Sequence, residues 1–101
     1  MNVIYEKIKD LIPIRRCIKY RENGDLLIVS NDESEIFYLN ETTKDFYLLC
    51  DGTSSFDMIL DSMIKIYDVS KNELIADFLG VVRDMQWKKI LSLKEIDYEK
   101  V

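Results

Sequence analysis

The chain is 101 residues long, with 48% hydrophobic and 33% charged residues and a formal net charge of −5. These values are typical of one globular domain with a modest core, and they exclude an intrinsically disordered chain. The sequence also lacks a long apolar run and the basic start of a signal peptide, so the expected location is cytoplasmic.

Residues 1–13 are expected to form an N-terminal arm. Ile4, Ile8 and Leu11 recur at helical spacing, which predicts a short amphipathic helix, and Pro13 ends it or begins the next element. The expected division of the chain is therefore this arm, a domain over residues 14–93 and a polar tail over residues 94–101.

The next part of the chain has the pattern of three short strands. Residues 14–20 and 26–29 flank a turn at 21–25 that contains Asn23-Gly24, which predicts a β-hairpin. A polar turn at residues 30–33 leads into a third strand at 35–39. The result is a predicted antiparallel meander, which needs helices on one face and leaves two edges open.

The hydrophobic period changes from that of a strand to that of a helix at Asn40. The Asn40 side chain is placed to cap a helix that begins at Glu41, with Glu41 and Asp45 near the positive end of the helix dipole. Gly52 is expected to end this helix in a left-handed conformation.

Two further helices are predicted. Ser54 or Ser55 caps the first of them, and Ser70 with Glu73 forms a capping box that opens the longest helix, which runs to about Lys88. The first has an apolar stripe at Phe56, Ile59, Leu60, Met63 and Tyr67. A last apolar piece follows at Ile90, Leu91 and Leu93.

The longest helix is apolar over an unusually wide part of its circumference. At about 100° per residue, its apolar side chains cover roughly 160°, whereas a stripe of about 100° seats a helix on a core. Either neighbouring elements bury the whole stripe, or one margin of it lines a groove. The side chains are Leu74, Ile75, Phe78, Leu79, Val81, Val82 and Met85.

The third strand is apolar on both faces. Ile36 and Tyr38 point to one side of the sheet, and Phe37 and Leu39 to the other. Unless it is covered, an apolar strand at a sheet edge invites pairing with another strand.

The order and spacing of several segments resemble the PqqD-like family, whose members are also called RiPP recognition elements. The resemblance covers residues 14–93 and implies an α+β, winged-helix-like fold, with a three-stranded antiparallel sheet followed by three helices. The segments are Tyr38-Leu39-Asn40-Glu41-Thr42, Cys50-Asp51-Gly52-Thr53, Ile59, Tyr67-Asp68-Val69, and Leu74 through Asp77 to Val82 and Met85.

The resemblance also implies a function. Members of the family are non-catalytic modules that capture the leader of a ribosomally synthesised precursor peptide by β-strand addition. They present it to a separate maturation enzyme, often a radical SAM protein, a cyclase or a protease. By position, main-chain hydrogen bonds would come from Glu35, Ile36, Phe37 and Tyr38. The apolar wall would be Ile75, Phe78, Leu79 and Val82, with Arg83 at its rim, while Leu74, Val81 and Met85 belong to the core.

The sequence departs from the family at two places. Members usually have a glycine where this chain has Lys89, so the longest helix is expected to be longer or differently capped at its end. The segment Met1–Leu11 is extra, and three roles stay open for it: a dimerisation element, a docking segment for the enzyme, or a frayed start. A homodimer is compatible with a small sheet that has an open edge.

Residue types that carry chemistry are scarce. The chain has no histidine, its three glycines are isolated, and Cys17 and Cys50 are far apart, which predicts buried, reduced thiols. No catalytic site, metal site or cofactor is therefore expected, and an enzyme is disfavoured. An adaptor that binds an unrelated protein through the same edge remains an alternative.

A second alternative is a winged-helix DNA-binding regulator. Its phosphate contacts would have to come from Arg15, Arg16, Lys19 and Arg21. The longest helix carries acidic residues and the whole chain is acidic, so the expectation is no nucleic-acid partner.

Overall fold

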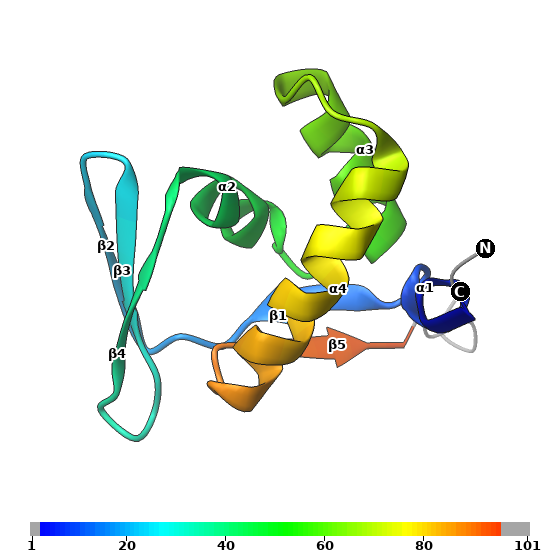
Figure 1. The fold of residues 1–101 in the computed structure, drawn as a ribbon. Helices are drawn as coiled ribbons and strands as arrows, with labels where there is room; N and C mark the ends of the chain where they lie inside the picture. Colours follow the sequence, from blue (N-terminus) through cyan, green and yellow to red (C-terminus); the bar gives the residue numbers. More distant parts are fainter. Residues whose placement is uncertain (1–2, 96–101) are drawn as a thin grey trace.

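The computed structural model describes residues 3–95 and has an α+β fold (Figure 1). Its three-stranded antiparallel sheet has the order β2-β3-β4, and β1 pairs with β5 in a separate antiparallel ribbon. The predicted meander and three helices are thus confirmed. In chain order the elements are α1 (Val3–Ile8), β1 (Ile12–Arg15), β2 (Lys19–Asn23), β3 (Leu26–Ser30), β4 (Ile36–Leu39), α2 (Glu41–Leu49), α3 (Phe56–Ile66), α4 (Lys71–Trp87) and β5 (Leu91–Lys94).

The predicted strand at residues 14–20 is wrong, because the structure divides it between two sheets. β1 pairs with β5, with Ile12 opposite Lys94 and Arg15 opposite Leu91, whereas β2 pairs with β3. Residues 16–18 carry the chain from one sheet to the other. A local alternation of side chains does not reveal partners, and the partner of β1 lies far along the chain.

The predicted helix caps are confirmed. The side chains of Asn40, Ser55 and Ser70 each accept a hydrogen bond from the backbone N–H three residues later, at the starts of α2, α3 and α4. Gly52 has a φ of 86°, as expected for a residue that turns the chain after α2. Within residues 3–95, no helix is long and apolar enough to cross a membrane.

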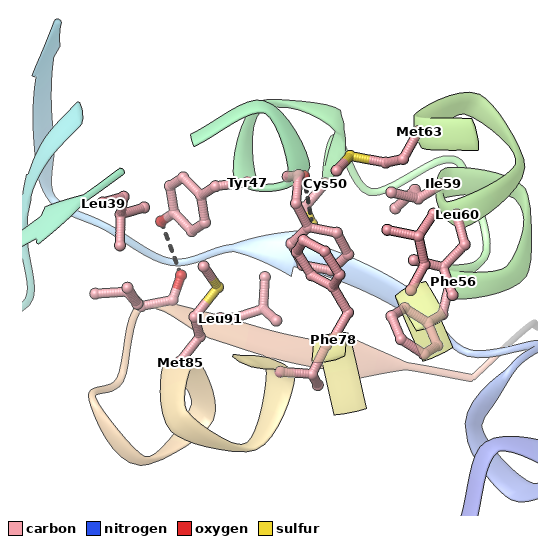
Figure 2. Packing of buried hydrophobic residues seen from close by; sticks show 14 of the residues in the cluster. Leu39, Tyr47, Cys50, Phe56, Ile59, Leu60, Met63, Phe78, Met85 and Leu91 are labelled. Atoms are coloured by element: carbon pink, nitrogen blue, oxygen red, sulfur yellow. Dashed lines mark hydrogen bonds between the residues drawn. The ribbon is translucent and has the colours of Figure 1, made fainter. Parts of the chain in front are cut away.

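Aromatic side chains from three helices meet in the core (Figure 2). The Phe46 ring of α2 lies 4.6 Å from that of Phe78 on α4 and 6.0 Å from that of Phe56 on α3, measured between ring centroids. The buried Tyr47 hydroxyl donates a hydrogen bond of 2.8 Å to the Ile90 carbonyl. These contacts fix α4 and the chain after it relative to α2, which follows directly from β4.

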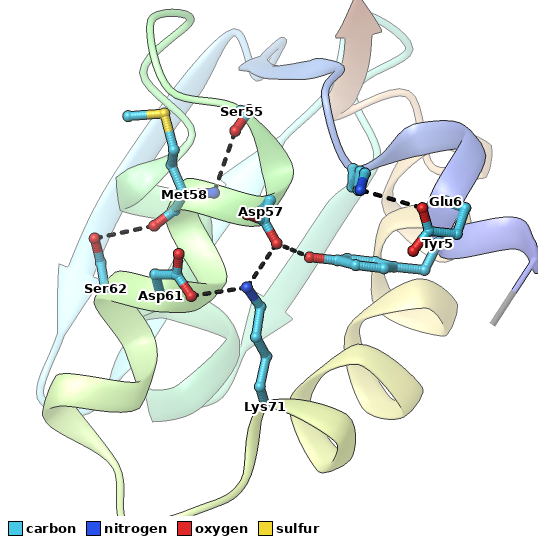
Figure 3. A network of polar contacts seen from close by, with 9 residues as sticks. Tyr5, Glu6, Ser55, Asp57, Met58, Asp61, Ser62 and Lys71 are labelled. Carbon is cyan, nitrogen blue, oxygen red and sulfur yellow. Dashed lines mark hydrogen bonds and ion pairs between the residues drawn. The ribbon is translucent and has the colours of Figure 1, made fainter. Parts of the chain in front are cut away.

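The N-terminal arm packs on the domain through Tyr5 (Figure 3). The Tyr5 ring contacts Phe56, and its hydroxyl donates to the carboxylate of Asp57. Lys71 bridges Asp57 at 2.7 Å and Asp61 at 2.8 Å. The Lys71 ammonium, followed by the Tyr5 hydroxyl, lowers the pKa of Asp57 below its usual value. The segment thus contains a short helix, α1, which is anchored by the buried Tyr5, whereas Ile4 is exposed.

Lys89 occupies a backbone conformation that suits glycine. Its φ is 62°, and the Ile90 N–H that follows donates to the Met85 carbonyl, so α4 ends as it would with glycine at this position. The helix is therefore not extended at its end. The Lys89 side chain pairs with Glu33, but both are exposed and contribute little.

We expect Lys89→Gly to raise the free energy of unfolding by about 0.5–1 kcal/mol, because glycine removes the left-handed strain of a side chain. Urea unfolding of both proteins measures the change. A Lys88→Gly variant is the control, because Lys88 has a right-handed backbone and should lose stability instead. Equal or lower stability of Lys89→Gly would contradict this account of the helix end.

Candidate functional site

Strand β4 lies at an edge of the three-stranded sheet. The Asn31 N–H donates to the Glu35 carbonyl at 3.1 Å, and in the same register Phe37 is opposite Val29. Because antiparallel pairs alternate in their bonding, the main chain of Phe37 faces β3 and that of Ile36 and Tyr38 faces the open edge. In the part of the chain that the structure describes, β4 pairs with β3 alone.

A hollow of about 200 Å³ runs beside this edge, between β4 and the C-terminal half of α4. We call it the β4–α4 groove. Its floor is apolar, because Leu39, Met85 and Ile90 are buried there, and Val81 forms a half-buried wall. The complete lining is Tyr38, Leu39, Asn40, Thr43, Val81, Asp84, Met85, Lys88 and Ile90.

Lys88 lies at the rim of the groove and contacts both of its sides. The ammonium is 2.7 Å from the Asp84 carboxylate and 5.1 Å from the centroid of the Phe37 ring. An ammonium over an aromatic face is attracted by the ring quadrupole. The end of α4 is therefore drawn toward β4, and the rim presents one cation and one carboxylate.

Asn31 holds the β3–β4 turn against the end of α4. Its side chain is 2% exposed and makes four hydrogen bonds. The amide nitrogen donates to the Glu35 carboxylate at 2.9 Å and to the Lys88 carbonyl at 2.8 Å. The amide oxygen accepts from the backbone N–H groups of Glu33 and Glu35, at 2.9 and 3.0 Å. Asn31 thus fixes the start of β4 relative to the end of α4.

From the sequence, Asn31 was predicted only as part of a polar turn. Its amide oxygen bonds to the backbone of Glu33 and Glu35, and asparagine favours such side-chain turns. This part of its role is local and could be predicted from the sequence. Its bond to the Lys88 carbonyl has no signal in the sequence, because it depends on tertiary packing.

The structure places the predicted helix residues away from β4. Phe78 and Val82 are core residues with 3% and 2% exposure. Leu79, Val82 and Arg83 line a different hollow of about 360 Å³, which Ile4 and Ile8 of α1 also line. Ile75 is half-buried and packs against the core. The helix face that meets β4 is instead the one with Val81, Asp84, Met85 and Lys88.

The physical reason is the rotation of α4 about its axis. Its wide apolar stripe has margins on both sides of Phe78, and either margin could have faced the sheet. The arm covers the Leu79 margin, so the Val81 margin lines the β4–α4 groove. Leu74 and Met85 are buried as predicted, and Met85 also forms part of the groove floor.

The predicted strand residues do not share one environment. Tyr38 lines the groove and is 67% exposed, and Ile36 is 60% exposed on the outer side of the sheet. Phe37 is half-buried on the inner side. The Glu35 main chain is bonded to Asn31 through both its N–H and its carbonyl. Among Glu35, Ile36, Phe37 and Tyr38, only Ile36 and Tyr38 therefore have main-chain N–H and carbonyl groups that can pair with a further strand.

The basic residues considered for nucleic acid serve different roles in the fold. Arg15 donates to the Leu48 carbonyl at 2.6 Å, at the end of α2, and Arg16 donates to the Ser92 hydroxyl at 2.7 Å. Lys19 and Arg21 lie on β2, at the opposite edge of the sheet from β4. They are therefore not gathered beside α4, the helix that would read DNA.

The two cysteines are free thiols. Cys50 is buried, and its thiol donates to the Phe46 carbonyl at 3.3 Å. Burial raises the pKa of Cys50 to about 12, so this thiol is held in its unreactive, protonated form.

The chain matches the sequence profile of a known protein family. The sequence profile of coenzyme PQQ synthesis protein D (PqqD) matches residues 25–91, which include β3, β4 and all three helices α2, α3 and α4. Comparisons with curated proteins and with solved structures returned no significant match.

Proposed function

The chain belongs to the family of coenzyme PQQ synthesis protein D, and from this premise we propose that it binds the leader of a ribosomally made precursor peptide in the β4–α4 groove. Proteins of this family are accessory components of PQQ and related peptide biosynthesis. The observation that supports leader binding most directly is the coincidence of an open strand edge with an apolar hollow beside it.

The leader would add to the sheet as a strand next to β4. The N–H and carbonyl groups of Ile36 and Tyr38 supply its main-chain hydrogen bonds, because these groups face the open edge. Main-chain bonds of this kind give affinity without regard to sequence, and side-chain pockets give selectivity.

Side chains of the bound strand would alternate between the two faces of the sheet. Those on the inner face enter the groove, where Val81 and Met85 offer apolar contact. Lys88 is the rim cation for a leader carboxylate, in place of Arg83, which lies beyond the groove on the far margin of α4.

In this proposal the domain itself is not catalytic. It holds the leader while the rest of the precursor extends into the active site of a separate cytoplasmic enzyme, such as a radical SAM protein, a cyclase or a protease. Holding two reactants together in this way raises their effective concentration and needs no chemistry from the binding module.

A matched pair of substitutions on α4 tests which margin of the helix binds the leader. Val81 and Leu79 are both half-buried aliphatic residues, two positions apart, but only Val81 lines the β4–α4 groove. We expect Val81→Gln to weaken leader binding by about 1–2 kcal/mol, because a polar side chain replaces apolar contact. Leu79→Gln should leave affinity within about 0.5 kcal/mol.

Isothermal titration calorimetry with a synthetic leader measures both affinities, and circular dichroism confirms that both variants are folded. Equal losses in the two variants would indicate a general effect on the fold. A loss confined to Leu79→Gln would place the leader on the margin of α4 that faces the arm and would contradict the proposed groove.

A further inference from the structure

The outer face of the three-stranded sheet is uncovered in the part of the chain that the structure describes. Figure 1 shows α2, α3 and α4 on one side of β2–β3–β4 and no element on the other. The outward positions of β3 and β4 include Ile28, Ile36 and Tyr38, and the latter two are well exposed. An exposed apolar sheet face of this kind marks an interaction site.

A hollow of about 400 Å³ lies on this face. Ile28, Ser30 and Ile36 line it from β3 and β4, and Lys19 and Arg21 line it from β2. The strand register places these side chains on the same face of the sheet, because Lys19 is opposite Ser30 and Arg21 is opposite Ile28.

The charge of this face is opposite to that of the chain. The whole protein has a net charge of −5, yet the outward positions of the three strands hold Lys19 and Arg21 and not one carboxylate. The acidic residue of β2, Glu22, is opposite the buried Leu27, on the inner face, and pairs there with Lys44 at 3.6 Å. Lys19 and Arg21 form no ion pair among residues 3–95.

We propose that this outer face is a second docking surface, separate from the leader groove, for an acidic amphipathic helix of a protein partner. Three strands at about 4.8 Å spacing form a face that one helix of about 10 Å diameter covers. The aliphatic stripe of the helix would pack on Ile28 and Ile36, and carboxylates along its margin would meet Lys19 and Arg21.

The two surfaces are compatible with each other. A leader strand adds beside β4 at the open edge and fills the groove on the inner side, whereas the helix lies over the outer faces of β2, β3 and β4. The domain can therefore hold a leader and a partner protein together, which an accessory protein of peptide biosynthesis needs. The docking surface does not depend on leader binding, because no residue of the β4–α4 groove except Tyr38 points to the outer face.

The test uses two model helices of about 15 residues with the same leucine stripe. One carries glutamates along its margins, and in the other each glutamate is replaced by lysine. We expect the acidic peptide to shift the amide NMR signals of β2 and of Ile28 and Ile36, and the basic peptide to leave them unchanged. In the double variant Lys19→Glu with Arg21→Glu, the preference should reverse by about ten-fold or more.

A second double variant, Lys7→Glu with Lys65→Glu, makes the same change in net charge at exposed positions on α1 and α3 and serves as the control. It should bind the acidic peptide as the unchanged protein does. Three results would overturn the proposal: binding of both peptides alike, the same loss in both double variants, or concentration-dependent shifts on the outer face without peptide. The last result would indicate pairing between two copies of this chain. None of these results would contradict leader binding in the β4–α4 groove. That proposal is tested separately, with the Val81→Gln and Leu79→Gln variants.

Discussion

Replacing Tyr38 with proline will weaken the proposed leader binding while the domain stays folded. The Tyr38 N–H faces the open edge of β4, so proline deletes a donor that the sheet itself does not use. A strand that adds to this edge loses that hydrogen bond and meets the proline ring instead. We expect affinity for the leader to fall by about 10–100-fold, which corresponds to roughly 1.4–2.8 kcal/mol.

The Tyr38→Ala variant distinguishes the contribution of the Tyr38 main chain to leader affinity from that of its side chain. It keeps the N–H and removes the ring, so its loss of affinity measures the side-chain contact alone, and we expect it to be smaller than that of proline. Calorimetry gives both affinities, and thermal unfolding shows whether each variant is folded. If Tyr38→Pro is folded and binds as well as Tyr38→Ala, the leader does not add to β4 as a strand.

Replacing Asn31 with alanine will lower the free energy of unfolding by about 2–4 kcal/mol. The change removes four hydrogen bonds and leaves the backbone N–H groups of Glu33 and Glu35 and the Lys88 carbonyl without the buried amide that pairs with them. A polar group left unpaired in a buried site costs about 1–3 kcal/mol, and water that reaches these groups recovers part of this. The link between the β3–β4 turn and α4 is lost as well, so leader affinity should fall too.

Urea unfolding measures this loss, and Asn23→Ala is its control. Asn23 is also an asparagine at the end of a strand, but it is exposed, so its replacement should change stability by less than about 0.5 kcal/mol. A similar small loss for Asn31→Ala would show that the network does not hold the turn against α4.

Local signals in the sequence were sufficient for most of the elements. The caps at Asn40, Ser55 and Ser70 were predicted correctly because a capping side chain bonds only to its own first turn. The hairpin of β2 and β3 was predicted from Asn23-Gly24, but its turn is shorter than predicted: Asn23 pairs with Leu26 as part of β2, and Gly24, with a left-handed φ of 63°, begins the turn.

Long-range pairing could not be predicted in the same way. The division of residues 14–20 between two sheets depends on the pairing of β1 with β5, the last described strand of the chain. A short segment of alternating residues fits either sheet equally well, because alternation identifies a face and not a partner.

The open strand edge could be predicted from the sequence, whereas the face of α4 that lies beside it could not. The open edge of β4 followed from its place as the last strand of the meander. The margin of α4 that faces this edge depends on what covers the other margin, and that is α1. Since the arm was identified as a helix but its docking site was unknown, the periodicity of α4 could not separate Val81 from Leu79.

In our proposal, the leader binds as a strand between β4 and the Val81 margin of α4. An amide-resolved NMR titration tests it most directly, with a synthetic leader from the short reading frame nearest to this gene. We predict shifts confined to Ile36–Asn40 and to the Val81–Lys88 face, with hydrogen-exchange protection gained at the Ile36 and Tyr38 amides. Shifts around Leu79 and Ile8, or binding without protection of those two amides, would contradict it.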